Sequence, residues 1–451
     1  MKRVRIGNGC GFWGDNLDAP RELAEQGQLD YLTLEYLAEL TMSILALQKQ
    51  RHPEAGYATD FLDVLTQLTP ILQRQPGLKI ITNAGGMNPQ GCAARARAVL
   101  DAAGVTQRRI AIVHGDDLLP RLDELLAQGH AFTNLDTGEP LALVRDRVVS
   151  VNAYLGCQPI VHALRQGADV VISGRVADAS LTLGPAVHEF GWAADDWDRL
   201  AAGTVAGHLI ECGAQATGGL WCNWQETDLS LVGYPFAEME ASGEFTIAKP
   251  PGSGGAVNRE TVAEQLLYEV GDPAAYLTPD VVADFTGVCL TEIGPDRVHV
   301  GGARGKPATG SYKVSIAYRD GWTAGGTLVL AGPDAVKKAH RCGEIIFERL
   351  RRARVAPQHR NIECLGAGDC VPGVSAVVDA PEVVLRVSVR DASRTVVERF
   401  ARELAPLVTS GPPGVTGYTT GRPPVREVFA YWPALVDKNA VVPQMQILGG
   451  D

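Results

Sequence analysis

Residues 168–175 read ADVVISGR, an apolar run that ends on Ser173 and Arg175. Consecutive Val and Ile residues are typical of a strand buried on both faces of a parallel sheet. Five earlier segments repeat this pattern: RVRIGN (3–8), DYLTLEYL (30–37), LKIITNAGG (78–86), RIAIVHGDD (109–117) and VVSVNAYLG (148–156). Together they predict a sheet of mostly parallel strands.

Amphipathic segments separate these strands. They are APRELAEQ (19–26), AARARAVLDAAG (93–104) and PIVHALRQG (159–167), each apolar on one face. Strands that alternate with such helices predict an α/β domain over residues 1–231, either doubly wound or barrel-like.

The rest of the chain predicts two smaller parts. Residues 232–340 combine a glycine-rich loop, a helix at 259–270 and antiparallel strands, which indicates a mixed lobe. Residues 341–451 alternate helices with strands in an order that predicts a small α+β unit.

The composition is that of a soluble globular protein, with 45% hydrophobic and 21% charged residues among 451. The net charge is −11 and no block of Lys or Arg of the kind that would neutralise a phosphate backbone is present, which argues against a nucleic-acid partner. No apolar run approaches the ~18 residues of a membrane span, and the start MKRVRIGNGCGFWGD lacks a signal-peptide core. We therefore expect a cytoplasmic protein without a membrane partner.

Polar side chains follow the predicted strands at the point where each strand ends. In parallel α/β folds these ends line the ligand crevice, so the side chains are expected to converge. The alternative is that each one serves the turn or caps the next helix. The residues are Asn8, Glu35, Asn83, His114 with Asp116, Asn152 with Tyr154, and Arg175 with Asp178.

Arg175 and Asp178 stand three residues apart after the last predicted strand. A guanidinium at that place would clamp a carboxylate or a phosphate, with Asp178 as its partner or as an acid/base group. A structural salt bridge is the alternative.

GHLIECGAQATGG (207–219) places His208, Glu211 and Cys212 on one face if the segment is helical. Acid/base work by His208 or Glu211, a metal site and simple helix packing all fit this face. Zinc would need a further ligand from elsewhere, and the nine cysteines contain no CxxC pair, so we expect reduced thiols and no metal.

Two glycine-rich stretches raise the question of phosphate binding. KPPGSGGAVN (249–258) precedes a predicted helix and would cradle phosphates of coenzyme A through Lys249, Gly252, Ser253, Gly254 and Gly255, or it forms a structural turn. Near the start, Gly9, Gly11 and Gly14 match the GxGxxG spacing of dinucleotide sites, which keeps a nucleotide-dependent oxidoreductase as an alternative. Phe12 and Trp13 occupy positions where small residues usually admit the pyrophosphate.

Long segments of the chain resemble the acyclic terpene utilisation protein AtuA family. The resemblance implies a role in the breakdown of acyclic terpenoids or branched-chain acyl-CoA compounds, without naming a reaction or a catalytic group. The segments include LDYLTLEYLAELTM (29–42), ITNAGGMNPQG (81–91), NAYLGCQPIVHAL (152–164), DVVISGRVADASL (169–181), GHLIECGAQATGG (207–219) and VREVFAYWPALV (425–436).

Longer family members continue into a small C-terminal domain described as ferredoxin-like, whereas this sequence ends at Asp451. The resemblance therefore implies a homo-oligomer that also pairs with a separately encoded small AtuA-like subunit.

The sequence thus favours an enzyme that performs acid/base chemistry, of lyase, hydratase or hydrolase type, on a carboxylated or CoA-linked branched acyl compound. No cofactor is expected beyond a coenzyme A moiety of the substrate, and a non-catalytic subunit or scaffold is the contrasting hypothesis. The candidate acid/base groups are His114, Asp116, Asp178, His208 and Glu211. The candidate substrate-binding groups are Asn8, Glu35, Asn83, Asn152, Tyr154 and Arg175.

Overall fold

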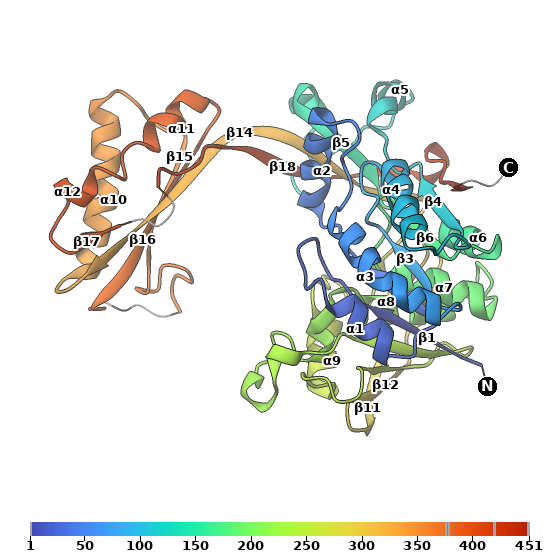
Figure 1. The fold of residues 1–451 in the computed structure, drawn as a ribbon. Coiled ribbons are helices and arrows are strands. Elements are labelled where there is room, and N and C mark those ends of the chain that lie inside the picture. The colour runs from blue at the N-terminus through green and yellow to red at the C-terminus, as the bar shows by residue number, and fades with distance from the viewer. Residues whose placement is uncertain (1, 375–376, 378, 418–420, 449–451) are drawn as a thin grey trace. The chain divides into compact units, whose positions relative to one another are not determined.

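A computed structural model describes residues 2–374, 377, 379–417 and 421–448. The chain forms two compact units (Figure 1). Unit 1 comprises Met1–Ala317 and Tyr431–Asp451, and unit 2 comprises Tyr318–Ala430. Within the described residues, no helix has both the length and the apolar character needed to cross a membrane.

Unit 1 is built on an open, mixed ten-stranded sheet whose middle is parallel, which confirms the α/β class; the parallel part is the five strands of the first 231 residues, and the strands on both sides are antiparallel. Because the sheet is open, the doubly wound alternative holds and the barrel-like one is wrong. The parallel strands, in spatial order, are β1 (Arg3–Asn8), β2 (Tyr31–Leu34), β3 (Lys79–Thr82), β6 (Val170–Ser173) and β4 (Ile110–His114).

Antiparallel strands extend the sheet on both sides. Next to β1 lie β7 (Phe236–Glu240), β8 (Phe245–Ala248), β12 (Arg297–Gly301) and β11 (Cys289–Gly294). On the opposite side, β19 (Gln444–Ile447) pairs with β4. A separate three-stranded sheet contains β13 (Arg304–Lys306), β10 (Val282–Asp284) and β9 (Tyr276–Leu277).

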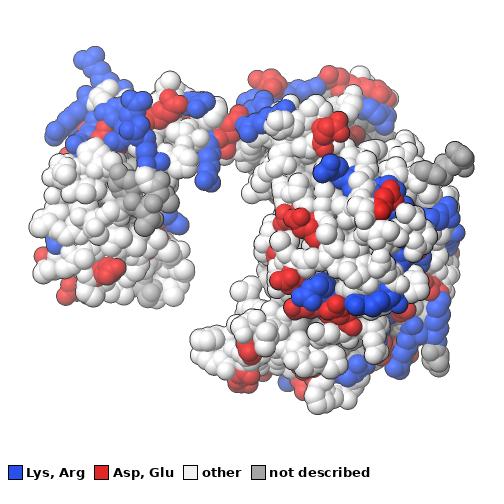
Figure 2. All heavy atoms as spheres, viewed as in Figure 1, with Lys and Arg blue, Asp and Glu red and all other residues white. Residues whose placement is uncertain are grey.

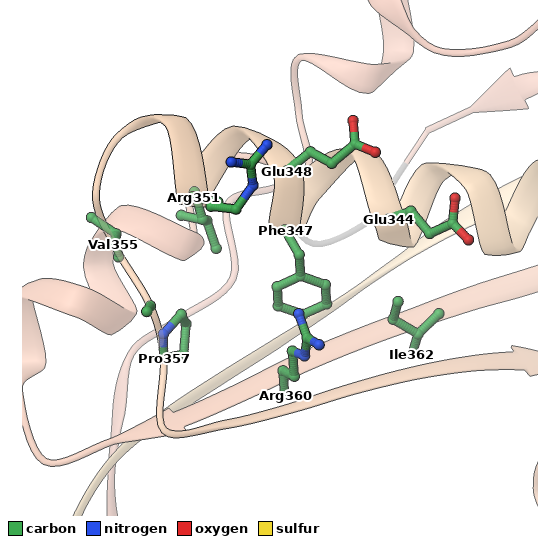
Figure 3. Close-up of a pocket in the computed structure, with 10 residues that line it drawn as sticks. Glu344, Phe347, Glu348, Arg351, Val355, Pro357, Arg360 and Ile362 are labelled. Carbon is green, nitrogen blue, oxygen red and sulfur yellow. The ribbon is translucent and has the colours of Figure 1, made fainter.

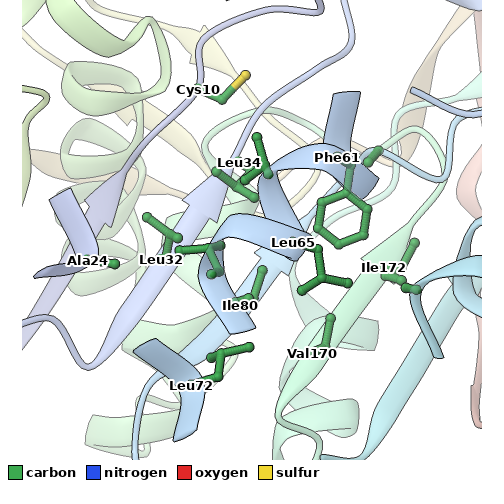
Figure 4. Close-up of a cluster of buried hydrophobic side chains, with 14 of the residues drawn as sticks. Cys10, Ala24, Leu32, Leu34, Phe61, Leu65, Leu72, Ile80, Val170 and Ile172 are labelled. Atoms are coloured by element: carbon green, nitrogen blue, oxygen red, sulfur yellow. The ribbon is translucent and has the colours of Figure 1, made fainter. Parts of the chain in front are cut away.

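Helices cover both faces of the parallel strands, and for this reason every residue of β2 and β6 is buried. On one face α1 (Ala19–Gln26), α3 (Asp60–Arg74) and α4 (Pro89–Ala102) pack side by side. Their apolar stripes meet Leu32, Leu34, Ile80, Val170 and Ile172 from the strands (Figure 4). Full burial of one such side chain stabilises a fold by roughly 1.5–3 kcal/mol.

A second group of helices packs against the same strands: α6 (Gln158–Arg165), α7 (Ser180–Phe190) and α8 (Trp197–Glu211). Further helices of unit 1 are α2 (Glu39–Arg51), α5 (Leu122–Ala127) and α9 (Arg259–Leu267). The Asn258 side chain caps α9 by accepting a hydrogen bond from the Thr261 N–H.

The segment 148–156 does not join the parallel sheet, so that part of the strand prediction is wrong. Its strand β5 (Val148–Ala153) pairs with β14 (Ser311–Ala331), and Asn152 forms an isolated bridge with Asp117. The reason is that β6 lies between β3 and β4, while β19 occupies the other edge of β4, which leaves β5 no edge to pair with.

Unit 2 has the β-α-β-β-α-β connectivity of ferredoxin-like units, with antiparallel strands in the order β15-β16-β14-β17. Its elements after β14 are α10 (Ala335–Arg352), β15 (His359–Leu365), β16 (Glu382–Asp391), α11 (Arg394–Phe400), α12 (Leu407–Ser410), β17 (Val415–Thr416) and β18 (Arg426–Asp437). The chain passes between the units within β14 and β18. Helix α10 covers the sheet, and Phe347 stacks on Phe400 in the core.

Candidate functional site

A cavity of about 450 Å³ lies in unit 1 beside the carboxyl ends of β1, β2 and β6. Loops after these strands form one side, and the end of α8 with the segment that follows it forms the other. The lining includes six carboxylates but a single cation, Arg175. These carboxylates belong to Asp15, Glu35, Glu39, Asp178, Glu211 and Glu269.

Glu35 is buried at the end of β2, and its carboxylate is held at one oxygen. Oε1 accepts hydrogen bonds from the Asn83 side-chain amide and from the Leu37 N–H (2.9 Å). Asn83 also accepts a hydrogen bond from the Tyr36 N–H (2.8 Å), so it fixes the whole turn. Burial raises the pKa of Glu35, the negative charge of Asp178 raises it further, and Arg175 opposes both effects.

The second oxygen of Glu35, Oε2, is buried without a hydrogen-bond partner among the described groups. Burial of a carboxyl oxygen without a partner costs free energy, and a bound ligand would remove that cost. Burial thus favours the protonated form of this carboxyl group, and a protonated carboxyl can donate one hydrogen bond into the cavity.

Arg175 is the central cation of the site and is fully enclosed. Its Nη1 donates to the Leu37 carbonyl (2.6 Å), its Nε donates to the Val176 carbonyl (3.0 Å), and its Nη2 pairs with Asp178. The guanidinium lies 4.4 Å from the centre of the Tyr154 ring. The expected Arg175–Asp178 pair is therefore present, and it is part of the cavity wall.

Asp178 faces the cavity beside this guanidinium. Its side chain is 37% exposed and belongs to the lining of the cavity. Burial raises the pKa of Asp178 to about 7, Glu211 and Glu39 raise it, and Arg175 opposes the rise. A carboxylate with a pKa near 7 can both take up and release a proton at neutral pH.

Asp116 lies behind the cavity wall, where it positions Arg175. Its Oδ2 accepts hydrogen bonds from the backbone N–H of Arg175 (2.9 Å) and from the Asn152 side-chain amide (2.9 Å). Burial raises the pKa of Asp116 to about 6. Asn152 thus reaches this cluster from β5, outside the parallel sheet.

His208 and Glu211 form a pair on α8, with 3.1 Å between Nδ1 and Oε1. The His208 ring is buried against the rings of Tyr276 and Phe285. Burial lowers the pKa of His208, but the hydrogen bond and the charge of Glu211, together with backbone carbonyls of α9, outweigh this effect and raise the pKa overall. Oε2 of Glu211 has no partner among the described groups and belongs to a residue that lines the cavity.

Asn8 and Tyr154 serve the walls of the cavity rather than its interior. The Asn8 amide donates to the carbonyls of Cys10, Ile210 and Glu211, which satisfies the end of α8 and ties it to β1. Tyr154 donates from its hydroxyl to Glu39 Oε1 (3.1 Å).

His114 lies away from the cavity, at the end of β4 opposite Gln444 of β19. Burial lowers the pKa of His114, and no contact joins it to the carboxylates of the site within the described residues. The structure therefore brings together all the strand-end residues named above except His114.

The glycine-rich loop at 249–255 lies outside this cavity, and Gly252 and Ser253 line a smaller one of about 200 Å³. The Lys249 amine donates to the Ser253 carbonyl (2.7 Å) and lies 3.0 Å from Asp296 Oδ2. The N–H groups of Gly254 and Gly255 already donate to backbone carbonyls. These contacts favour the structural turn over the phosphate cradle.

Replacing Lys249 with alanine should therefore lower the free energy of unfolding by about 1–3 kcal/mol, because it leaves the Ser253 carbonyl and Asp296 without their buried donor. Thermal unfolding of the variant measures this loss. Unchanged unfolding together with weaker coenzyme A binding would instead restore the phosphate-binding interpretation.

The early glycines also have packing roles. A Cβ at Gly11 would lie 2.8 Å from the backbone of Cys212, and one at Gly9 would lie 2.8 Å from Pro20. Helix α1 begins only at Ala19, five residues beyond Gly14, so the loop does not lead directly into a helix as in dinucleotide sites.

Several lining residues were not singled out from the sequence: Glu39, Gln215, Tyr234, Tyr268 and Glu269. Glu39 lies four residues after Glu35, and Gln215 lies three residues after Cys212. This proximity to predicted site residues is the signal that could have found them. Among the described residues, no group of three or more His, Cys, Asp or Glu is arranged to hold a metal ion. Burial and nearby carboxylates raise the pKa of Cys212 to about 12, which keeps its thiol protonated.

The fold and the site define an α/β protein with a carboxylate-rich cavity at the carboxyl end of its parallel strands. The chain belongs to the acyclic terpene utilisation family AtuA, whose family model matches residues 4–447. No curated protein and no solved structure matches the chain.

Proposed function

We propose that this cavity binds the acyl part of a branched, unsaturated acyl-CoA and catalyses a hydratase or lyase reaction by proton transfer. The observation that carries the proposal is a pair of carboxyl groups whose pKa values are raised by burial, that of Glu35 well above its usual range and that of Asp178 to about 7. We assign Glu35, whose Oε2 is buried without a partner among the described groups, as the neutral acid of this pair. Two titratable groups with separated pKa values supply an acid and a base in one site. The family description supports a role in acyclic terpene utilisation.

The acyl thioester is favoured over a free carboxylic acid by the charge of the lining. Arg175, the only cation in the lining, is already paired with Asp178. A carboxylate bound there would meet several carboxyl groups and no free cation, which is unfavourable in a poorly solvated site. A thioester carbonyl is neutral and needs only a hydrogen-bond donor.

In hydration, Asp178 acts as the base and Glu35 as the donor. The Asp178 carboxylate takes a proton from water while the water oxygen bonds to the β-carbon of the conjugated thioester. The neutral Glu35 donates a hydrogen bond from Oε2 to the thioester oxygen, where negative charge develops. The proton held by Asp178 then passes to the α-carbon, and the reverse sequence is the elimination of water.

The cavity volume of about 450 Å³ suits a substrate whose acyl part is bound inside and whose coenzyme A part stays outside. Ligand pockets typically measure ≈ 300–1,000 Å³ and enclose the group that reacts. Only the acyl part has to enter, so the phosphates of coenzyme A stay outside the carboxylate-rich lining.

The direct test is to incubate the protein with 3-methylbut-2-enoyl-CoA in deuterated water and to follow the product by mass spectrometry. The proposal expects addition of one water and a deuterium at the α-carbon. An unchanged thioester, or free coenzyme A and acid without a hydrated product, would contradict it; the second outcome indicates a hydrolase.

Glu35 offers a sharper test because its proposed form is neutral. Glu35→Gln should keep the rate within about tenfold of the wild type, since an amide is also a neutral donor of similar shape. Glu35→Ala should lower the rate about 10²–10³-fold through loss of that donor. A rate for Glu35→Gln as low as for Glu35→Ala would mean that Glu35 works as an anion.

A further inference from the structure

Unit 2 contains a larger cavity, of about 700 Å³, that the proposed reaction does not use. It lies between α10 and the segment 355–362, which includes the first half of β15 (Figure 3). Its floor is apolar, formed by Phe347, Leu350, Val355 and Ile362. Among the described residues, β15 is the edge strand of its sheet and has no further strand beside it.

Two cations line this cavity, Arg351 toward one end and Arg360 near its middle (Figure 3). Arg352 and Arg354 follow Arg351 in sequence outside the lining, and the four residues, called here the arginine cluster, are all exposed. Within the described part of the chain none of the four forms an ion pair, whereas Arg341, earlier on the same helix, pairs with Glu344 and Glu348. Lys and Arg side chains gather at the top of this unit in Figure 2.

Unit 2 as a whole is also positively charged, like the arginine cluster. Residues 318–430 contain 16 Lys and Arg against 12 Asp and Glu, a net charge of +4 in a chain whose net charge is −11. Basic residues in the last turn of a helix also stabilise the helix dipole, which accounts for Arg351 and Arg352. It does not account for Arg354 and Arg360, which lie beyond the helix.

The cavity is also polar at its other end. Figure 3 shows Arg351 and Pro357 toward one end, Glu344 and Ile362 toward the other, and Phe347 with Arg360 between them. The Arg360 guanidinium lies 5.5 Å from the centre of the Phe347 ring. Glu344 and Arg351 are seven residues apart on α10, about 10 Å along the helix axis.

We propose that this cavity binds a nucleoside phosphate. The phosphates contact Arg351 and its neighbours in the arginine cluster, which present charge-assisted donors suited to phosphate oxygens. The planar base stacks on the free face of the Arg360 guanidinium, whose other face contacts Phe347, because guanidinium groups stack on planar rings. Glu344 and Glu348 accept hydrogen bonds from the hydroxyl and amino groups of the nucleoside.

The carboxylate of Glu344, at the second end, selects this ligand over simpler anions (Figure 3). Inorganic phosphate or an acidic peptide would gain nothing from Glu344 and would be repelled by it. A nucleoside phosphate carries anionic oxygens at one end and hydrogen-bond donors at the other, in the same order as the cavity. The cavity volume falls within the ≈ 300–1,000 Å³ of small-molecule sites.

The ligand has two sources, a free nucleotide or the nucleoside end of coenzyme A. Isothermal titration calorimetry of the full chain with ADP and with coenzyme A distinguishes them, since the proposal expects binding of at least one. Adenosine and inorganic pyrophosphate should each bind at least tenfold more weakly than the nucleotide, because each lacks one half of the contacts. This binding is independent of the reaction proposed for unit 1, so either proposal can fail alone.

The test variant combines Arg351→Ala with Arg360→Ala. The matched control is Lys337→Ala, in the first turn of α10. The double variant should weaken nucleotide binding at least tenfold, since it removes two charged donors. The control should bind like the wild type, and both should keep the wild-type unfolding temperature because the residues are exposed.

Three results would overturn the proposal. They are the absence of binding by both ADP and coenzyme A at millimolar concentration, equal binding by the double variant and the wild type, and pyrophosphate binding as tight as that of ADP. The last result would describe an ordinary anion site without a place for the nucleoside.

Discussion

Replacing Asp178 with asparagine is expected to lower the rate of hydration and of deuterium incorporation by about 10²–10⁴-fold, the usual contribution of a general base. Asparagine keeps the size of the side chain and can still accept a hydrogen bond from Arg175, but it takes up no proton. Asp146→Asn, at an exposed position of unit 1, is the control and should leave the rate unchanged.

The pH dependence identifies the base independently. Asp178 must be ionised to accept a proton, so the rate should rise with pH and level off above an apparent pKa of about 7. Below that pH the carboxylate is protonated and the rate falls by about tenfold per pH unit. The residual activity of Asp178→Asn should not show this rise of rate with pH. If the rise survives the substitution, the titrating group is not Asp178.

Replacing Arg108 with alanine should have the largest effect on stability, about 3 kcal/mol or more in the free energy of unfolding of unit 1. Its buried guanidinium donates to four backbone carbonyls near the end of α3, at distances of 2.8–3.0 Å. The variant removes this donor from all four carbonyls, of which that of Gln75 keeps a bond from the Leu78 N–H (3.2 Å) and those of Leu72 and Leu78 are buried. The carbonyls belong to Leu72, Gln75, Pro76 and Leu78.

Arg109→Ala is the matched control, because this neighbouring side chain is exposed and donates to a single carbonyl, that of Gln166. It should cost less than about 1 kcal/mol. Urea unfolding followed by circular dichroism compares the two variants. If both variants lose the same free energy of unfolding, the bonds from Arg108 to the carbonyls at the C-terminal end of α3 do not stabilise the fold.

The parallel strands could be predicted because each is an apolar run followed by a polar turn, a pattern set by burial on both faces. The misplaced segment 148–156 has the same local pattern, so only the pairing partner distinguishes it. Its partner, β14, lies more than 150 residues away in sequence, and no local signal identifies such a neighbour. The helices α2 and α3 were not predicted, although Asp60–Arg74 has a clear apolar face.

The sequence could predict those site residues that directly follow strands of the sheet. It could not predict those that reach the cavity only through the packing of distant segments. Glu35, Arg175 and Asp178 follow strands of one parallel sheet, whose carboxyl ends meet by geometry. Tyr268 and Glu269 reach the cavity from the end of α9, and their position depends on how that helix packs. His114 ends a strand as Glu35 does, but β4 lies at the far side of the parallel set, two strands beyond β3.

The pairing of β19 with β4 has a consequence for biosynthesis. The ribosome makes Gln444–Ile447 after all of unit 2, yet these residues complete the sheet of unit 1. Unit 2 is continuous in sequence and can fold as soon as it emerges, whereas the nascent unit 1 keeps the outer edge of β4 open until Gln444–Ile447 have also been made. An open strand edge is a place where chains associate wrongly, so this stage of synthesis is the one at which the protein most needs a chaperone.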